Sequence, residues 1–162
     1  MGPKKVNLTA KQRERLLRQN WHSHDSRWFL KVAQELGPTV ANRLNQITVR
    51  SMGKTEAKRF LTESNSGEVK NIEDLLHLFQ EMGGLYYPDF ECKILDKNTI
   101  LMYNTKCAIP ASAPAFYECA CMVRAEGCME GLGLDAEAWL RKSRKEGDDI
   151  CEGIYRIKEW KK

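Results

Sequence analysis

The sequence lacks any long hydrophobic run. No segment approaches the roughly 18 consecutive apolar residues of a membrane-spanning helix, and the start, "MGPKKVNLTAKQRER", lacks the apolar core of a secretion signal. These absences argue against a membrane protein and predict a cytoplasmic one. In that compartment the six cysteines are expected to be thiols rather than a disulfide framework.

Dense basic blocks, internal repeats and low-complexity linkers are absent as well. The 26 basic and 22 acidic residues leave a net charge of +4 that is spread along the chain, which argues against nucleic acid as a partner. A chain of 162 residues has the usual size of one domain, which buries about two-thirds of its unfolded surface. We therefore expect a single domain over residues 1–162, with a helical half (1–84) and a mixed half (85–162).

The first half has the periodicity of helices. Apolar side chains recur at three- and four-residue steps and form one stripe, made of Leu17, Trp21, His24, Trp28, Val32 and Leu36. Glycine and proline, which suit a helix end and a following first turn, separate this helix from the next. Three helices are expected, over Thr9–Leu36, from Val40 to the segment 64–67, and around Ile72–Phe79 up to Gly83-Gly84.

The second half changes to a mixed pattern. Two short strand-like runs flank Lys97-Asn98, which indicates a hairpin. A helix capped by Ser112 is expected from near Pro114 to Gly131 or Gly133, followed by a short helix from Asp135 that contains Trp139 and Leu140, and by a strand over Ile150–Lys158. Helices and strands segregated along the chain predict an α+β fold, with a helical layer on an antiparallel sheet.

The segment "ECACMVRAEGCMEGLG" holds three of the cysteines. If it is helical, Cys119 and Cys121 point to nearly opposite sides, and Cys121 and Cys128 lie about 10 Å apart, too far to share one zinc ion. The thiols could pack as small apolar groups, react as nucleophiles, or bind a metal together with Cys107 or Cys151. The candidate metal ligands, for zinc or an iron–sulfur cluster, are Cys119, Cys121, Cys128 and Cys151.

Two further features of the sequence suggest sites. Gly127 and Gly131 lie on one helical face, where a neighbouring strand or a bound molecule can approach the backbone closely. His24 and Asp25 lie beside the aromatic stripe, an environment that can shift the pKa values of acid–base groups. The same pair could instead cap the core and bond the nearby backbone.

Two segments resemble known families. "NWHSHDSRWFLKVAQELGPTVANRLNQITVRSMGKTEAKRF" resembles the N-terminal helices of an uncharacterised bacterial and archaeal family related to L-2-amino-thiazoline-4-carboxylic acid hydrolase. "CMVRAEGCMEGLG" followed by "GDDICEGIYRI" is similar to the 4-vinyl reductase, or hydrocarbon-binding, domain. These resemblances imply helices on an antiparallel sheet, often in a homodimer, around a pocket for a small apolar molecule. They also imply a zinc ion held by Cys119 or Cys121 together with Cys151.

Three functions follow as hypotheses. The first is a sensor, carrier or accessory subunit that binds a small organic molecule in a mostly apolar pocket, lined by Trp21, Trp28, Phe116, Cys121, Gly127 and Gly131. The second is a hydrolase of a C–N or C–S bond, in which His24 acts as base, Asp25 orients it, and Cys107 or Cys121 attacks. The third is a redox or iron–sulfur protein that uses its cysteines, Cys107, Cys119, Cys121, Cys128 and Cys151.

Overall fold

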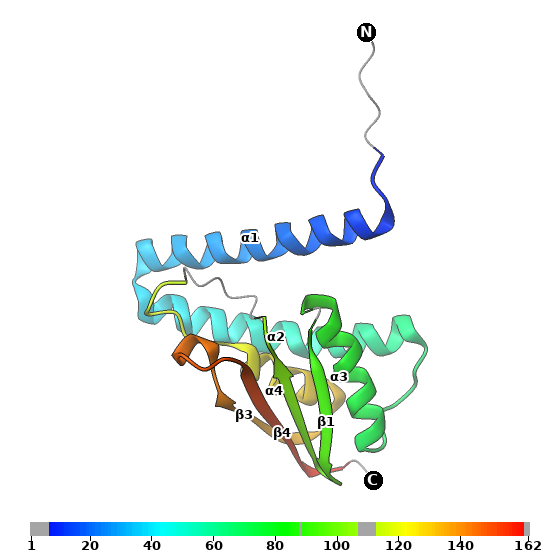
Figure 1. Ribbon diagram of the computed structural model, residues 1–162. Helices are drawn as coiled ribbons and strands as arrows, with labels where there is room; N and C mark the ends of the chain where they lie inside the picture. The colour runs from blue at the N-terminus through cyan, green and yellow to red at the C-terminus, as the bar shows by residue number, and fades with distance from the viewer. Residues whose placement is uncertain (1–6, 88, 107–112, 161–162) are drawn as a thin grey trace. The chain divides into compact units, whose positions relative to one another are not determined.

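The computed structural model describes residues 7–87, 89–106 and 113–160. The chain divides into two compact units, Met1–Ala41 and Asn42–Lys162. Figure 1 colours the described chain by residue number, from blue in the first unit to red in its last strand. The single domain expected over residues 1–162 stays a prediction. Among the described residues, no helix has the length and apolar character that crossing a bilayer requires.

Helix α1, Ala10–Leu36, forms most of the first unit and confirms the first predicted helix. Thr9 begins it with a capping box, because its hydroxyl accepts a hydrogen bond from the Gln12 N–H while the Gln12 side chain accepts one from the Thr9 N–H. Gly37 ends it at a φ of 87°, which glycine adopts without strain.

The apolar stripe predicted along α1 is not its buried side. Trp21 is 50% exposed and Trp28 39% exposed, whereas Phe29 and Ala33 are buried. Successive residues of a helix are turned by about 100°. The buried side is therefore turned by one residue from the predicted stripe, and His24 is exposed with the tryptophans.

A four-stranded antiparallel sheet, ordered β1-β2-β4-β3, forms the centre of the second unit. The predicted hairpin is confirmed: β1 pairs with β2, and the Asp96 carboxylate accepts a hydrogen bond of 2.9 Å from the Asn98 N–H in the turn. The predicted last strand is confirmed as β4, which lies between β2 and β3. The strands span Glu91–Asp96 (β1), Thr99–Asn104 (β2), Asp135–Lys142 (β3) and Cys151–Glu159 (β4).

Helices pack on this sheet and confirm the predicted α+β class. In Figure 1, α4 lies behind the strands and α3 beside β1. The most deeply buried large side chains come from both layers and are Leu75, Ile100, Met129 and Ile157. The helices span Pro38–Ser64 (α2), Ile72–Tyr86 (α3) and Cys121–Leu132 (α4), with a 3₁₀ turn at Arg144–Glu146.

Helix α4 begins at Cys121, not near Pro114 as predicted. The preceding segment is bound to α2 instead of turning into a helix. The Asn42 side chain donates a hydrogen bond to the Phe116 carbonyl (2.7 Å) and accepts one from the Glu118 N–H (3.0 Å). These bonds occupy backbone groups that a helix would need. Ser112, the predicted cap, lies outside the described residues.

Two other predictions about helices are wrong: one in the type of the element and one in its end. The short helix expected from Asp135 is strand β3, because alternate residues Ala136, Ala138 and Leu140 pack on the core while β3 pairs with β4. Sheet pairing here overrides the helix propensity of alanine and leucine. Helix α3 continues past Gly83, whose missing side chain makes room for a ring: a Cβ there would lie 2.1 Å from Phe90.

Glycines bring α2 and α4 into backbone contact. A Cβ at Gly53 would lie 2.3 Å from the Arg124 carbonyl oxygen, and one at Gly127 would lie 2.1 Å from the Arg50 carbonyl oxygen. Gly131 meets the next turn of α2 at a similarly short distance. The close neighbour of the glycine-spaced helix is therefore another helix, α2, and not the strand or bound molecule that was expected.

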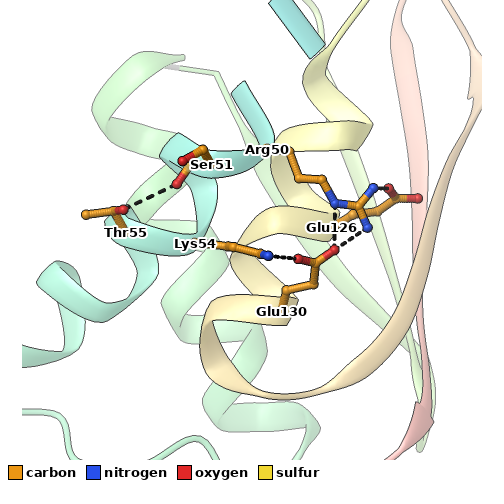
Figure 2. A network of polar contacts seen from close by, with 6 residues as sticks. All are labelled: Arg50, Ser51, Lys54, Thr55, Glu126 and Glu130. Atoms are coloured by element: carbon orange, nitrogen blue, oxygen red, sulfur yellow. Dashed lines mark hydrogen bonds and ion pairs between the residues drawn. The ribbon is translucent and has the colours of Figure 1, made fainter. Parts of the chain in front are cut away.

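An ion-pair network borders this helix contact (Figure 2). The Arg50 guanidinium donates to Glu130 at 2.6 Å and to Glu126 at 3.1 Å, and Lys54 reaches Glu130 at 2.5 Å. The four side chains are 27–51% exposed, so water screens their charges. Pairs of this kind contribute about 0–1 kcal/mol each, so the network adds little to stability.

The close contact at Gly127 and the open space at Gly84 predict opposite effects when each glycine is replaced by alanine. Gly127→Ala should lower the free energy of unfolding by about 1–3 kcal/mol, because its methyl group would meet backbone rather than a flexible side chain. Gly84→Ala, inside α3 with nothing within 4 Å, should raise it by about 0.5–1 kcal/mol. Urea unfolding measures both, and equal effects would contradict the proposed role of the contact.

Candidate functional site

A small pocket opens between α3, α4 and the sheet of the second unit. Its volume is about 50 Å³. Most of its wall is apolar or aromatic, and its polar groups are two thiols, two phenols and one guanidinium. The lining residues are Phe79, Met82 and Gly83 of α3, Tyr87 and Phe90 of the following loop, Met102 of β2, Cys121, Arg124, Ala125 and Cys128 of α4, and Tyr155 of β4.

Arg124, the one charged side chain in the pocket wall, is paired with Glu56, which lies outside the wall. Arg124 donates two hydrogen bonds to the Glu56 carboxylate of α2, at 2.8 and 2.5 Å, and the two side chains are only 16% and 13% exposed. Burial lowers the pKa of Arg124, and the bonds and charge of Glu56 outweigh that effect and raise it. The guanidinium also lies 4.2 Å from the centre of the Tyr86 ring.

Burial keeps two other titratable groups of the pocket, Cys128 and Tyr155, neutral. Burial raises the pKa of Cys128 to about 12, and it raises the pKa of Tyr155 well above its usual value. The Tyr155 ring meets Phe79 edge to face, with ring centres 4.8 Å apart. A neutral thiol and a neutral phenol beside aromatic rings form a wall suited to an uncharged ligand.

Cys119 and Cys121 lie together, which corrects the geometry expected from the sequence. Their sulfur atoms are 3.5 Å apart. The expected separation to opposite sides assumed one helix through both residues, but Ala120 is the N-cap and only Cys121 is helical. The Cys119 sulfur accepts hydrogen bonds from the Cys121 thiol and, more weakly, from the Cys121 N–H. These bonds outweigh the effect of burial and lower the pKa of Cys119 to about 7.

The metal-binding role predicted for these cysteines has no site in the described part of the chain. No group of three or more His, Cys, Asp or Glu side chains there is placed to hold a metal ion. Cys151 is buried, and its sulfur accepts a hydrogen bond of 3.4 Å from the Arg144 N–H. Cys107, predicted as a nucleophile, lies outside the described residues. Zinc and iron–sulfur binding stay predictions.

The predicted ligand-binding and catalytic residues are distributed over both units. Cys121 lines the pocket, Gly127 and Gly131 face α2, and Phe116 is 40% exposed. Four more belong to the first unit, where they are exposed on α1: Trp21, Trp28, His24 and Asp25. The hydrolase mechanism with His24, Asp25 and a cysteine stays a prediction.

Sequence reasoning missed most of the pocket wall. Arg124 and Glu56 are 68 residues apart, and no local pattern shows that they pair. A signal existed for the α4 residues, because Cys121, Ala125 and Cys128 recur at helical spacing once the helix begins at Cys121. The contributions of α3 and the strands depend on the tertiary fold.

Known proteins resemble this chain in fold, not in sequence family. No family model matches the chain, and no curated protein matches it. The resemblance to the thiazoline-carboxylate hydrolase and 4-vinyl reductase families therefore stays a prediction.

One solved structure similar to the chain is a trafficking protein particle complex subunit 3 from Naegleria fowleri, covalently bound to palmitic acid. It has 15% identity and a TM-score of 0.63, with 94% of this chain and 99% of that one covered. An H-NOX protein from S. oneidensis has 16% identity and a TM-score of 0.49 over 81% of this chain and 72% of its own. The first likeness shows that the α+β arrangement recurs in a known protein.

The Arg124–Glu56 pair predicts a strong effect on stability. Glu56→Gln should lower the free energy of unfolding by about 3–5 kcal/mol, because it leaves a buried guanidinium without its counter-charge. The matched change Glu126→Gln, in the exposed network, should cost about 1 kcal/mol or less. Denaturant unfolding compares the two, and similar losses would contradict the buried pair's role.

Proposed function

We propose that this chain is a small-molecule binding protein whose pocket between α3, α4 and the sheet takes an uncharged, mostly apolar ligand. The observation that carries this proposal is the composition of the pocket wall, in which aromatic, methionine and thiol groups surround a guanidinium already paired with Glu56. Ligand sites are commonly apolar cavities with few polar groups. A sensor, a carrier or an accessory subunit would use such a site.

The pairing of Arg124 with Glu56 favours an uncharged ligand over an anionic one. Arg124 makes two bonds to Glu56 and contacts Tyr86, so a ligand carboxylate would have to compete with an existing buried pair. A buried anion without a free partner is costly. A neutral ligand with one weak hydrogen-bonding group, facing Cys121 or Tyr155, meets no such competition.

The size of the pocket requires some rearrangement on binding. Its volume of about 50 Å³ is below the ~150 Å³ of an apolar cavity that holds benzene. Met82 and Met102 line it, and methionine is unbranched and flexible, so it changes rotamer at low cost. Support for a larger ligand comes from the trafficking subunit of similar fold, which is covalently bound to palmitic acid.

Binding of n-alcohols of increasing length tests this function. With ¹³C-methyl methionine in the full chain, n-butanol to n-octanol should shift the Met82 and Met102 methyl signals saturably. Affinity should rise about four-fold per added CH₂, as expected for roughly 0.8 kcal/mol of burial. Hexanoate should bind more weakly than hexanol, because the pocket offers its carboxylate no free cation.

Two variants locate the binding. Ala125→Leu places a larger side chain in the pocket wall and should weaken hexanol binding at least about ten-fold, since the added atoms occupy the ligand's space. Met52→Leu, outside the wall, should leave affinity unchanged. Thermal unfolding checks that both variants fold. Unsaturable shifts, or equal affinity in Ala125→Leu and wild type, would refute the proposal.

A further inference from the structure

The sulfur atoms of Cys119 and Cys121 are in direct contact. They lie 3.5 Å apart, about 1.5 Å more than the S–S bond of about 2.05 Å in a disulfide. Cys119 precedes α4 and Cys121 is its first residue, so Cys119 is outside the hydrogen-bonded turns of that helix. Rotation of the two side chains can close the gap without unwinding α4. Both residues are half-buried rather than enclosed.

The two thiols are placed differently. Cys121 is the first residue of α4 and lines the pocket wall, whereas Cys119 precedes the helix. Both are half-buried, while Cys128 and Cys151 are buried. Cys119 is therefore the sulfur placed to attack, and Cys121, whose sulfur lies 3.5 Å away, is in place to resolve the product.

We propose that Cys119 and Cys121 form a redox-active dithiol that reduces disulfides of the glutathione class and is converted to an intramolecular disulfide. The Cys119 thiolate attacks one sulfur of the small disulfide, forms an S–S bond to it, and expels one glutathione thiolate. The Cys121 thiolate then attacks Cys119 Sγ and expels the second. The protein loses two electrons and two protons, and the small disulfide gains them as two thiols.

The pair also touches the pocket, because Cys121 lines its wall. In the disulfide form the Cys121 sulfur turns toward Cys119, so oxidation should change affinity for an apolar ligand. This consequence rests on the proposed function. The dithiol chemistry does not, because it depends on the two sulfur atoms and can be measured with no ligand present.

Equilibration with reduced and oxidised glutathione tests the dithiol. The full chain is equilibrated without oxygen over a range of ratios, acid-quenched, alkylated and fragmented by mass spectrometry. The expected product is a single disulfide between Cys119 and Cys121, lost in Cys119→Ser and in Cys121→Ser. The controls Cys107→Ser and Cys151→Ser should retain it. A disulfide that maps to Cys107 or Cys151, or none at any ratio, would overturn the proposal.

The rate of reaction with glutathione disulfide tests the roles of the two thiols. Cys121→Ser lacks the resolving thiol, so it should react with glutathione disulfide and stop at a mixed disulfide on Cys119. Cys119→Ser lacks the attacking thiol and should react at least about ten-fold more slowly than wild type. A mixed disulfide that accumulates on Cys121 in wild type, or equal rates in Cys119→Ser and wild type, would contradict these roles.

Discussion

Helices α2 and α4 approach each other to backbone contact because glycines occupy their crossing, and the position of the pocket depends on that contact. Gly53 lies against the Arg124 carbonyl, and Gly127 lies against the Arg50 carbonyl. Glu56 follows Gly53 by three residues, about one helical turn. The crossing therefore brings the Glu56 carboxylate to the Arg124 guanidinium. Because the two charges are paired, Arg124 lines the pocket without giving it a net charge.

The second consequence of the crossing is that α4 has two functional sides. One side meets the α2 backbone through glycine, and the other carries Cys121, Ala125 and Cys128 to the pocket. The start of the helix is determined separately, because Asn42 binds the backbone on either side of Tyr117 and keeps that segment out of the helix. That late start places Cys119 beside Cys121. The proposed ligand site and the proposed dithiol thus meet at one end of α4.

The features of the fold that follow from local spacing and turn residues could be predicted from the sequence. The long helix to Leu36, the hairpin at Lys97-Asn98, the last strand and the α+β class are confirmed, since each follows from spacing or turn residues. Asp135–Lys142 was not predictable in this way, because its helix-forming residues become a strand only by pairing with β4. The proximity of Cys119 and Cys121 was missed for a similar reason: it depends on a side chain of α2.

The proposed function depends on whether the space between α3, α4 and the sheet admits apolar molecules. A crystal structure of the protein under xenon pressure answers this question, because xenon enters apolar cavities without needing a polar partner. We expect xenon among Phe79, Met102 and Tyr155. Xenon absent from this pocket, in crystals where it occupies another cavity of the protein, would refute the proposed binding site.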